Sequence, residues 1–189
     1  MWVHLETERL LLRRFTEADE DDLVALDGDP EVTRFINGGK STSREDARSR
    51  IARWLGQYEE RDGFGFWAAV ERGSGRFLGW FEFRPPGGEP PPGEVELGYR
   101  LRREVWGRGH ATEGARALIR KGFTELGVER VIAHTMAVNL ASRRVMEKSG
   151  LVFVRAFHQD WPETIEGSEH GDVEYALTRA EWEAHPEPR

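Results

Sequence analysis

The stretch "WGRGHATEG", Trp106 to Gly114, decides how this chain is interpreted, because it places two glycines directly before a long amphipathic run. Gly107 and Gly109 have no Cβ, so a bulky ligand can approach their backbone N–H groups. The first N–H groups of a helix lack an internal partner and carry partial positive charge. A glycine loop that opens a helix therefore predicts an anion site, and phosphate is the commonest anion bound in this way.

Three kinds of phosphate site contain a glycine loop before a helix. A Walker loop needs G-x-x-x-x-G-K-[ST], which the chain lacks. A dinucleotide fingerprint needs G-x-G-x-x-G within an early parallel βαβ unit, and here Gly107, Gly109 and Thr112 break that pattern. The third kind is a site for the pyrophosphate of coenzyme A. A plain turn before a helix would have a similar composition, so the choice depends on the surrounding elements.

Length and composition predict one soluble globular domain, residues 1–189. The net charge of −7 argues against nucleic-acid binding and slightly favours cationic partners. The absence of cysteine excludes disulfides, thiolate metal sites and a cysteine nucleophile. The chain shows no apolar run of membrane-spanning length and no signal peptide, so we expect a cytoplasmic protein without a membrane partner. The six histidines lack metal-ligand spacing, so we expect no metal.

Hydrophobic periodicity predicts a mixed α/β (α+β) order of elements. Capping residues and apolar stripes predict helices at 16–26, 29–36, 43–60, 110–126 and 139–150. Alternating runs predict strands at 8–15, 64–71, 76–84, 94–101, 130–138, 151–160 and 172–179. The turn "RGSG" and the loop "PPGGEPPPG" join three of these strands into an antiparallel meander. Four large aromatic residues are expected in the core, namely Trp54, Trp67, Trp80 and Trp106.

Two motifs about 30 residues apart give the chain a family resemblance. W-G-x-G-x-A-T-E begins at Trp106, and N-x-x-S-x-x-x-x-E-x-x-G begins at Asn139 after a helix and a strand. This combination resembles the GNAT superfamily of N-acetyltransferases, and more narrowly the RimJ/RimL branch, which acetylates protein N-termini and other amines. The resemblance extends from "ERLLLRRF" to "DVEYALTRAEW". It implies one domain with a mixed, mostly antiparallel twisted sheet flanked by helices, whose splayed central strands hold coenzyme A.

The same resemblance implies where acetyl-CoA, the acetyl donor, binds. The glycine loop would face the pyrophosphate, and Asn139 would orient pantetheine. Backbone N–H groups around Tyr99 to Leu101 would face the thioester carbonyl and pantetheine. Arginines near the loop would neutralise phosphate charge, although a surface arginine is usually only solvated. The expected contacts with acetyl-CoA are Tyr99, Arg100, Leu101, Trp106, Gly107, Arg108, Gly109, His110, Ala111, Thr112, Asn139 and Arg144.

The sequence departs from the family pattern at three positions, and one of them bears on the acid. Glu104 stands where relatives have Arg or Gln, and Leu151 stands where an aromatic residue is common. Met146 replaces the tyrosine that is the general acid of many relatives, and a thioether cannot donate a proton. In the RimL-like branch, a serine matching Ser142 is thought to protonate the departing thiolate. We therefore expect Ser142 to be the acid. The alternative is that Asn139 is a helix N-cap and Ser142 a polar first-turn residue.

The base is expected on the strand "EVELGYRL". A primary amine near pH 7 is mostly ammonium, which cannot attack a thioester until it loses a proton. Alternation places Glu94, Glu96 and Gly98 on one face of the strand. Relatives often carry a carboxylate here that works through a bound water, and Glu96 matches it. The alternative is a glutamate that only faces solvent.

The connection "DWPETIEGSEHG" (160–171) is expected to meet the acceptor, because in relatives the acceptor enters opposite coenzyme A. Trp161 would stack on the acceptor or contact its cation, with Glu163 beside it. Residues 156–171 contain no lysine or arginine, so their carboxylates would attract cations. Those carboxylates are Asp160, Glu163, Glu166 and Glu169. The alternative is a solvated acidic loop without a ligand.

The resemblance thus implies an enzyme that transfers acetyl from acetyl-CoA directly to a primary amine, above all the N-terminal amine of a protein or peptide. Two alternatives stay open. One is acetylation of a small amine, such as an antibiotic or a polyamine. The other is a non-catalytic acyl-CoA-binding regulator, which the substitutions at Glu104 and Met146 keep open. The sequence does not identify the acceptor, and it leaves a homodimer open.

Overall fold

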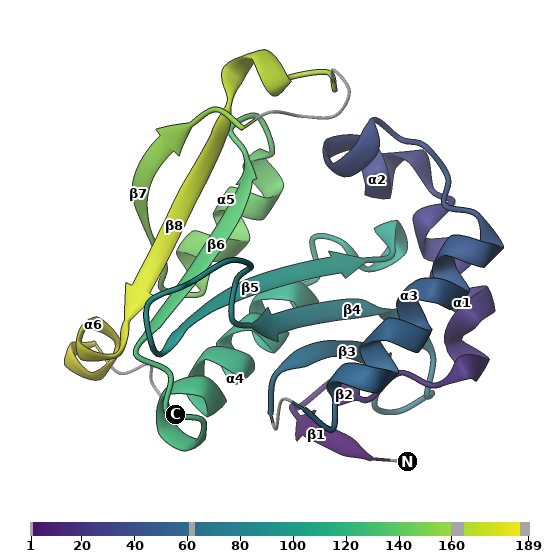
Figure 1. Cartoon of the computed structure of the whole chain (residues 1–189), viewed down its shortest axis with the longest axis horizontal. Coiled ribbons are helices and arrows are strands. Elements are labelled where there is room, and N and C mark those ends of the chain that lie inside the picture. The colour runs from purple at the N-terminus through teal and green to yellow at the C-terminus, as the bar shows by residue number, and fades with distance from the viewer. Residues whose placement is uncertain (1, 61–62, 160–164, 186–189) are drawn as a thin grey trace.

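The computed structural model describes residues 2–60, 63–159 and 165–185 of the chain. These residues form one eight-stranded sheet in the order β1-β2-β3-β4-β5-β6-β8-β7 (Figure 1). Neighbouring strands are antiparallel except β5 and β6, which are parallel. The strands are β1 (Val3–Glu6), β2 (Leu10–Arg13), β3 (Gly65–Glu71), β4 (Phe77–Arg84), β5 (Glu94–Leu101), β6 (Arg130–Met136), β7 (Val152–Phe157) and β8 (Asp172–Thr178).

Helices cover the two faces of this sheet differently. The helices are α1 (Glu20–Asp27), α2 (Pro30–Asn37), α3 (Arg44–Gln57), α4 (His110–Glu125), α5 (Leu140–Lys148) and α6 (Arg179–Ala184). Helices α1 and α3 bury their apolar sides against β3 and β4 on one face, which we call the front face. Helices α4 and α5 pack on the opposite, back face. Over β6, β7 and β8, the described helices cover the back face and leave the front open (Figure 1).

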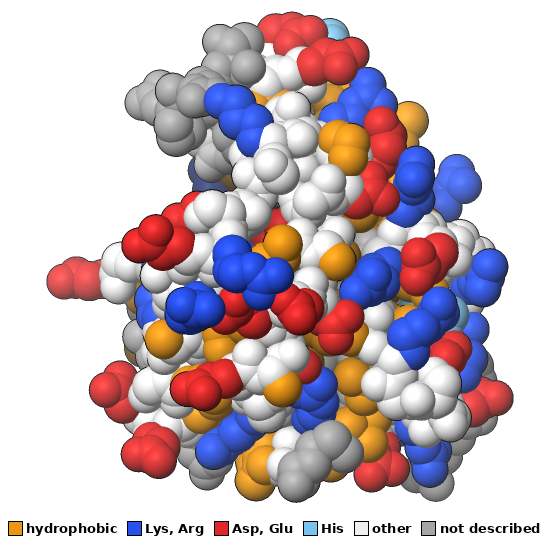
Figure 2. Space-filling view, turned by 90° about the vertical axis from the view of Figure 1, so that its right-hand side faces the viewer, with side chains coloured by type: hydrophobic (Ala, Val, Ile, Leu, Met, Phe, Trp, Pro, Cys, Tyr) orange, Lys and Arg blue, Asp and Glu red, His pale blue; other side chains and the backbone are white. Residues whose placement is uncertain are grey.

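The outer surface of α1 and α3 is charged in both signs. Figure 2 shows this side of the molecule, with arginine and carboxylate side chains interspersed. Arg44 and Arg48 of α3 both bind Glu20 of α1. Such exposed pairs contribute little stability, so the covering helices are held mainly by their buried apolar sides. None of the helices in the described ranges is long and apolar enough to cross a membrane.

Helix α4 lies unusually close to the sheet because two of its residues are glycine. A Cβ on Gly114 would lie 2.3 Å from Cζ of Phe81, and one on Gly122 would lie 2.6 Å from Cζ of Phe83. Both phenyl rings belong to β4 and are fully buried. The missing side chains therefore let the rings of β4 fill the space against the helix axis.

The two central strands separate partway along their length. Pairing between β5 and β6 covers Glu94–Glu96 and Arg130–Ile132. Beyond that point β5 stays paired with β4 as far as Leu101. Strand β6 instead stays paired with β8 as far as Met136. The carboxyl-terminal halves of β5 and β6 thus follow different neighbours, which confirms the predicted pair of splayed central strands.

The elements expected from the sequence are present, and three expectations need correction. The first strand of the sheet is β1, which was not expected, and the strand expected at 8–15 is the shorter strand β2. Helix α6 was not expected, although Thr178 and Glu181 form a capping box that marks its start. Trp54, Trp67 and Trp80 lie in the core as expected, but the side chain of Trp106 is 46% exposed.

Candidate active site

The glycine loop joins the end of β5 to α4, and its backbone requires glycine at two positions. A 3₁₀ turn (Arg103–Val105) follows β5, and α4 begins at His110. Gly107 has φ 71° and Gly109 has φ 83°, both in the left-handed region that other residues rarely adopt. A Cβ on Gly107 would meet nothing within 4 Å. The loop therefore presents open backbone in front of the unpaired N–H groups of a helix, which is suited to an anion.

Two hydrogen bonds fasten the glycine loop to the rest of the domain. The indole Nε1 of Trp106 donates to the backbone oxygen of Leu101 at 2.8 Å. Nη1 of Arg9, which precedes β2, donates to the backbone oxygen of Arg108 at 2.8 Å. Arg9 also binds the carboxylate of Glu113, in the first turn of α4. This hydrogen bond of Trp106 fastens the loop to the end of β5.

On the back side of the splayed strands, Tyr99 of β5 meets Ser142 of α5. The phenolic oxygen of Tyr99 lies 3.0 Å from the backbone oxygen of Ser142 and 3.1 Å from its Oγ. Burial raises the pKa of the Tyr99 phenol, so the group keeps its proton near neutral pH. Two neutral hydroxyl groups therefore lie within hydrogen-bonding distance where the strands diverge.

Asn139 serves as the N-cap of α5. Its Oδ1 accepts from the backbone N–H of Ser142 at 3.3 Å, and its Nδ2 donates to Oγ1 of Thr135 at 3.0 Å. This is the alternative that the sequence left open for Asn139, and it sets the position of Ser142. Met146 lies one turn further along α5 and is buried in the core, where an apolar side chain suits the position.

The arginines that follow Ser142 differ from each other. Arg143 donates to the hydroxyl of Tyr175 at 3.1 Å and to the backbone oxygen of Ala137 at 3.0 Å, so it ties α5 to the sheet. Arg144 is exposed on the surface of α5. The arginine on β5, Arg100, has its guanidinium on the front face, where it binds the buried Asp27. Its side chain is therefore already paired on the front face.

On the front side, the last paired residue of β5 belongs to a chain of ionisable groups. Oε1 of Glu96 lies 3.1 Å from Nδ1 of His134 on β6, and Nε2 of His134 lies 3.4 Å from Oε2 of Glu174 on β8. The hydrogen bond to Glu96 raises the pKa of His134 against the opposing effect of burial. Although burial opposes its ionisation, hydrogen bonds from Arg155, His134 and Arg130 hold the pKa of Glu174 below its usual range. The front side is therefore charged where the back side carries hydroxyls.

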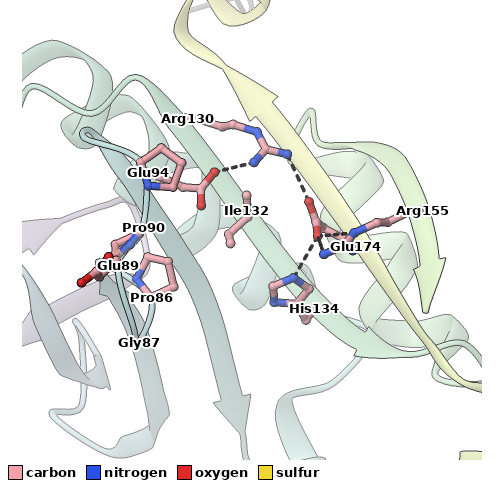
Figure 3. Close-up of a pocket in the computed structure, with 11 residues that line it drawn as sticks. Pro86, Gly87, Glu89, Pro90, Glu94, Arg130, Ile132, His134, Arg155 and Glu174 are labelled. Atoms are coloured by element: carbon pink, nitrogen blue, oxygen red, sulfur yellow. Dashed lines mark hydrogen bonds and ion pairs between the residues drawn. The ribbon is translucent and has the colours of Figure 1, made fainter. Parts of the chain in front are cut away.

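These charged groups line a pocket of about 330 Å³ (Figure 3). One wall is the proline-rich loop that precedes β5, with Pro86 and Pro90 facing the strands. The opposite wall is formed by β6 and β8, where Arg130 bridges the carboxylates of Glu94 and Glu174. The pocket is thus an open, mixed-charge concavity on the front face, and His134 connects it to Glu96.

A further carboxylate on the front face was missed by the sequence reasoning. Glu82 of β4 lies beside β5, with Arg84 Nη2 2.6 Å from its Oε1. Burial raises the pKa of Glu82 to about 7; Arg84 acts against this shift and the negative charge of Glu96 adds to it. The signal in the sequence was a single carboxylate within the apolar strand "FLGWFEFR". An acidic group in such a run is buried at a cost and needs a structural or chemical reason.

The acidic connection between β7 and β8 is described in part. Asp160, Trp161 and Glu163 lie outside the described residues. Glu166 lies 3.3 Å from Nη2 of Arg34 in α2, so this connection and α2 meet across the upper end of the molecule (Figure 1). An arginine from another element thus offsets part of the negative charge that the sequence predicted at this rim.

Comparisons with known proteins agree with this geometry. Residues 9–152 match the family model of the acetyltransferase (GNAT) domain. The "FsC-acetyl coenzyme A-N(2)-transacetylase" of Aspergillus fumigatus is 36% identical over 184 residues, covering 94% of this chain and 77% of that protein. An uncharacterized N-acetyltransferase of Bacillus subtilis, YoaA, is 31% identical and covers 79% of this chain and 83% of its own length.

Solved structures of the same fold include a GNAT family acetyltransferase from Bacillus anthracis, with a TM-score of 0.77, 24% identity and coverage of 93% of this chain and 98% of that one. The ribosomal L7/L12 alpha-N-protein acetyltransferase RimL, in complex with coenzyme A, also has a TM-score of 0.77, at 19% identity, covering 93% of this chain and 97% of that one. The chain belongs to the GNAT acetyltransferase family and is an acetyl-CoA-dependent N-acetyltransferase.

Proposed function

We propose that this acetyltransferase acetylates the N-terminal amine of a protein or peptide, as the RimJ/RimL branch does, with Ser142 as the acid and Glu96 as the carboxylate that receives the amine. One observation carries the proposal. Strands β5 and β6 part directly after Glu96, which faces front, and Tyr99 meets Ser142 on the back face just beyond. An acid and a carboxylate that attracts the acceptor ammonium thus border the same gap from opposite faces of the sheet.

The donor side of the proposal rests on the loop and on β5. Residues 106–112 supply open backbone and the first N–H groups of α4 for the pyrophosphate of acetyl-CoA. Beyond Glu96, the edge of β5 that turns away from β4 is released from β6. Backbone N–H groups on that edge, between Tyr99 and Leu101, would hydrogen-bond the thioester carbonyl and pantetheine and stabilise charge that develops on the carbonyl oxygen.

The residues then divide the proton transfers between them. An acceptor ammonium is attracted by the front carboxylates and loses one proton there. The neutral nitrogen attacks the thioester carbon, and the C–S bond breaks when the tetrahedral intermediate collapses. The leaving thiolate takes the proton of the Ser142 hydroxyl, while the Tyr99 hydroxyl donates to the backbone oxygen of Ser142 and holds that residue in place. Asn139 acts through Ser142, because it fixes the start of α5.

An N-terminal amine suits this arrangement because its pKa, about 8, is lower than that of a lysine side chain, about 10.4. An N-terminal ammonium therefore loses its proton more readily than a lysine side chain before the nitrogen attacks the thioester. A small amine is the second candidate, and a specific observation favours it: the relative that is 36% identical is named for acetylation at an N(2) nitrogen. Family membership favours either enzyme over a non-catalytic acyl-CoA-binding protein.

Thiol release from acetyl-CoA tests the proposal. The panel would contain peptides with a free N-terminus, the same peptides with a blocked N-terminus, spermidine and an aminoglycoside. We expect thiol release with the free peptides and a matching mass increase of one acetyl group, with no reaction of the blocked ones. Preference for spermidine or the aminoglycoside would favour a small amine. Binding of acetyl-CoA without thiol release across the panel would indicate a non-catalytic protein.

A further inference from the structure

Glu82 occupies an unusual place for a carboxylate. It lies on the front face of β4, between the part of the sheet covered by helices and the gap between β5 and β6. Its cross-strand neighbour is Gly98, which belongs to the part of β5 released from β6. A Cβ on Gly98 would lie 3.0 Å from Oε2 of Glu82. Glycine therefore leaves room for the carboxylate to lie directly over the backbone that borders the gap.

The charged groups around Glu82 come from two strands and one pair of helices. Arg84 approaches from its own strand, with Nη2 2.6 Å from Oε1. Glu96 and Arg100 face it from β5. Arg100 is engaged by Asp27 of α1, which also binds Arg50 of α3. On its other side Glu82 pairs with Phe66 of β3, which adds apolar surface. The result is a carboxylate with one close cation, a nearby carboxylate and an apolar flank.

The two carboxylates nearest the gap therefore differ in their surroundings. Glu96 is hydrogen-bonded to His134, which lines the pocket on the front face. Glu82 is more enclosed, with a side chain that is 15% exposed against 26% for Glu96. Its pKa of about 7 means that it is ionised in part of the molecules at neutral pH and protonated in the rest. Two neighbouring carboxylates in unlike environments commonly take different roles in acid–base chemistry.

We propose that Glu82 is a second catalytic carboxylate, which takes the proton of the acceptor ammonium, while Glu96 and its hydrogen bond to His134 hold the ammonium at the gap. The inference deepens the proposed function and rests on it. The ammonium gives one proton to Oε2 of Glu82 and becomes a neutral amine. After attack on the thioester carbon, the nitrogen loses a second proton to water, and the thiolate gains one from Ser142, which is then reprotonated from water. Glu82 then gives its proton to solvent, so one proton is released in total for each acetyl group transferred.

The decisive experiment is the pH dependence of kcat/KM in Glu82→Gln, measured by thiol release with a peptide that has a free N-terminus. A base must be ionised to accept a proton, so wild-type kcat/KM should rise up to about pH 7, and it should fall again above pH 8, where the peptide ammonium with its pKa of about 8 is lost. In Glu82→Gln we expect a loss of about a hundredfold at pH 8 and the disappearance of the rise near pH 7. In Glu96→Gln we expect a higher KM for the peptide with the rise retained.

Two controls and one further variant separate this role from a structural one. Glu125→Gln changes an exposed glutamate that pairs with Lys121 at the far end of α4, and it should leave the profile unchanged. Stabilisation by acetyl-CoA should be equal in wild type and Glu82→Gln, which shows that the variant is folded. Gly98→Ala should fold, because the backbone at Gly98 needs no left-handed conformation. The added methyl group lies against the Glu82 carboxylate, so the pH at which kcat/KM rises should shift.

Carbon-13 NMR of the wild-type Glu82 carboxyl group provides a readout that does not need turnover. We expect it to titrate near pH 7. Titration in the ordinary glutamate range would overturn the proposal, and so would a Glu82→Gln variant that keeps the wild-type rise while Glu96→Gln loses it. A wild-type protein that releases no thiol with any amine would refute the proposed function, and this inference with it, before any variant is compared.

Discussion

The two sides of the gap between β5 and β6 carry opposite kinds of chemistry. The back side holds neutral hydroxyls, Tyr99 and Ser142, next to the glycine loop. The front side holds ionisable groups that hydrogen-bond across strands, among them Glu96 and His134. A sheet whose strands part opens to both faces, so a donor and an acceptor can approach from opposite sides. This separation keeps the acid away from the carboxylates that would otherwise hydrogen-bond with it.

The largest effect that the comparison predicts concerns the hydroxyl side. Ser142→Ala should lower kcat by about a hundredfold and change KM for acetyl-CoA little, because a positioned acid acts in the transition state. Steady-state kinetics with a peptide acceptor would measure both. Ser74→Ala, in the turn between β3 and β4, is the matched control and should behave as wild type. A Ser142→Ala variant with unchanged turnover would leave Ser142 with a purely structural role at the start of α5.

The next effect concerns the anion site. Gly109→Val should weaken acetyl-CoA binding at least tenfold, roughly 1.4 kcal/mol, because a branched residue is strained at φ 83° and obstructs the loop backbone. Thermal shift would report it: acetyl-CoA should stabilise the wild type, while NAD and ATP should not. Gly127→Val is the matched control, since Gly127 has φ 69° with nothing within 4 Å of its Cβ position. It should lower the melting temperature and keep the shift. Stabilisation of the wild type by NAD alone would contradict the coenzyme A site.

A smaller effect concerns the charged side. His134 has its pKa raised by Glu96, so its ion pairs stabilise the fold below the unfolded-state pKa of about 6.5, and that contribution is lost as pH rises through the higher folded value. His134→Gln should therefore reduce the free energy of unfolding by less than about 1 kcal/mol at pH 6 and hardly at all at pH 9. Urea unfolding at both values would measure this difference. An equal loss at both would mean that packing, and not charge, is the contribution of His134.

The smallest effect concerns the upper end of the molecule. The pair between Arg34 and Glu166 is exposed on both sides, so it should contribute less than about 1 kcal/mol. Removal of the arginine in Arg34→Gln leaves the acidic connection less compensated. Acetylation of a cationic peptide should then gain by about twofold over an acidic one at low salt, and the gain should fade as ionic strength rises. A gain that persists at high salt would point to a contact other than charge.

The sequence was informative where function depends on short segments. The conformation of Gly107 and Gly109, the N-cap at Asn139 and the absence of a proton donor at Met146 are all local properties, so each could be predicted from neighbouring residues. The family resemblance then supplied the splayed strands and the donor, which composition alone does not provide.

The front side could not be predicted in the same way, because its groups come from different strands. Whether Glu82 lies over Gly98, or His134 between Glu96 and Glu174, depends on cross-strand register, which no single segment encodes. The exposure of Trp106 was missed for a related reason, since its partner is a backbone oxygen at the end of β5. Helix α6 was different, because the capping box of Thr178 and Glu181 is a local signal from which its start could have been predicted.

Amide hydrogen exchange with and without acetyl-CoA tests the two-sided gap most directly, since it needs neither an acceptor nor a variant. The account predicts slower exchange on addition of acetyl-CoA in residues 97–101 of β5 and 106–112 of the glycine loop. Exchange of the amides in the proline-rich loop of the front pocket, at Gly87, Gly88 and Glu89, should stay unchanged. Slower exchange in that front loop, with the glycine loop and the end of β5 unaffected, would contradict it.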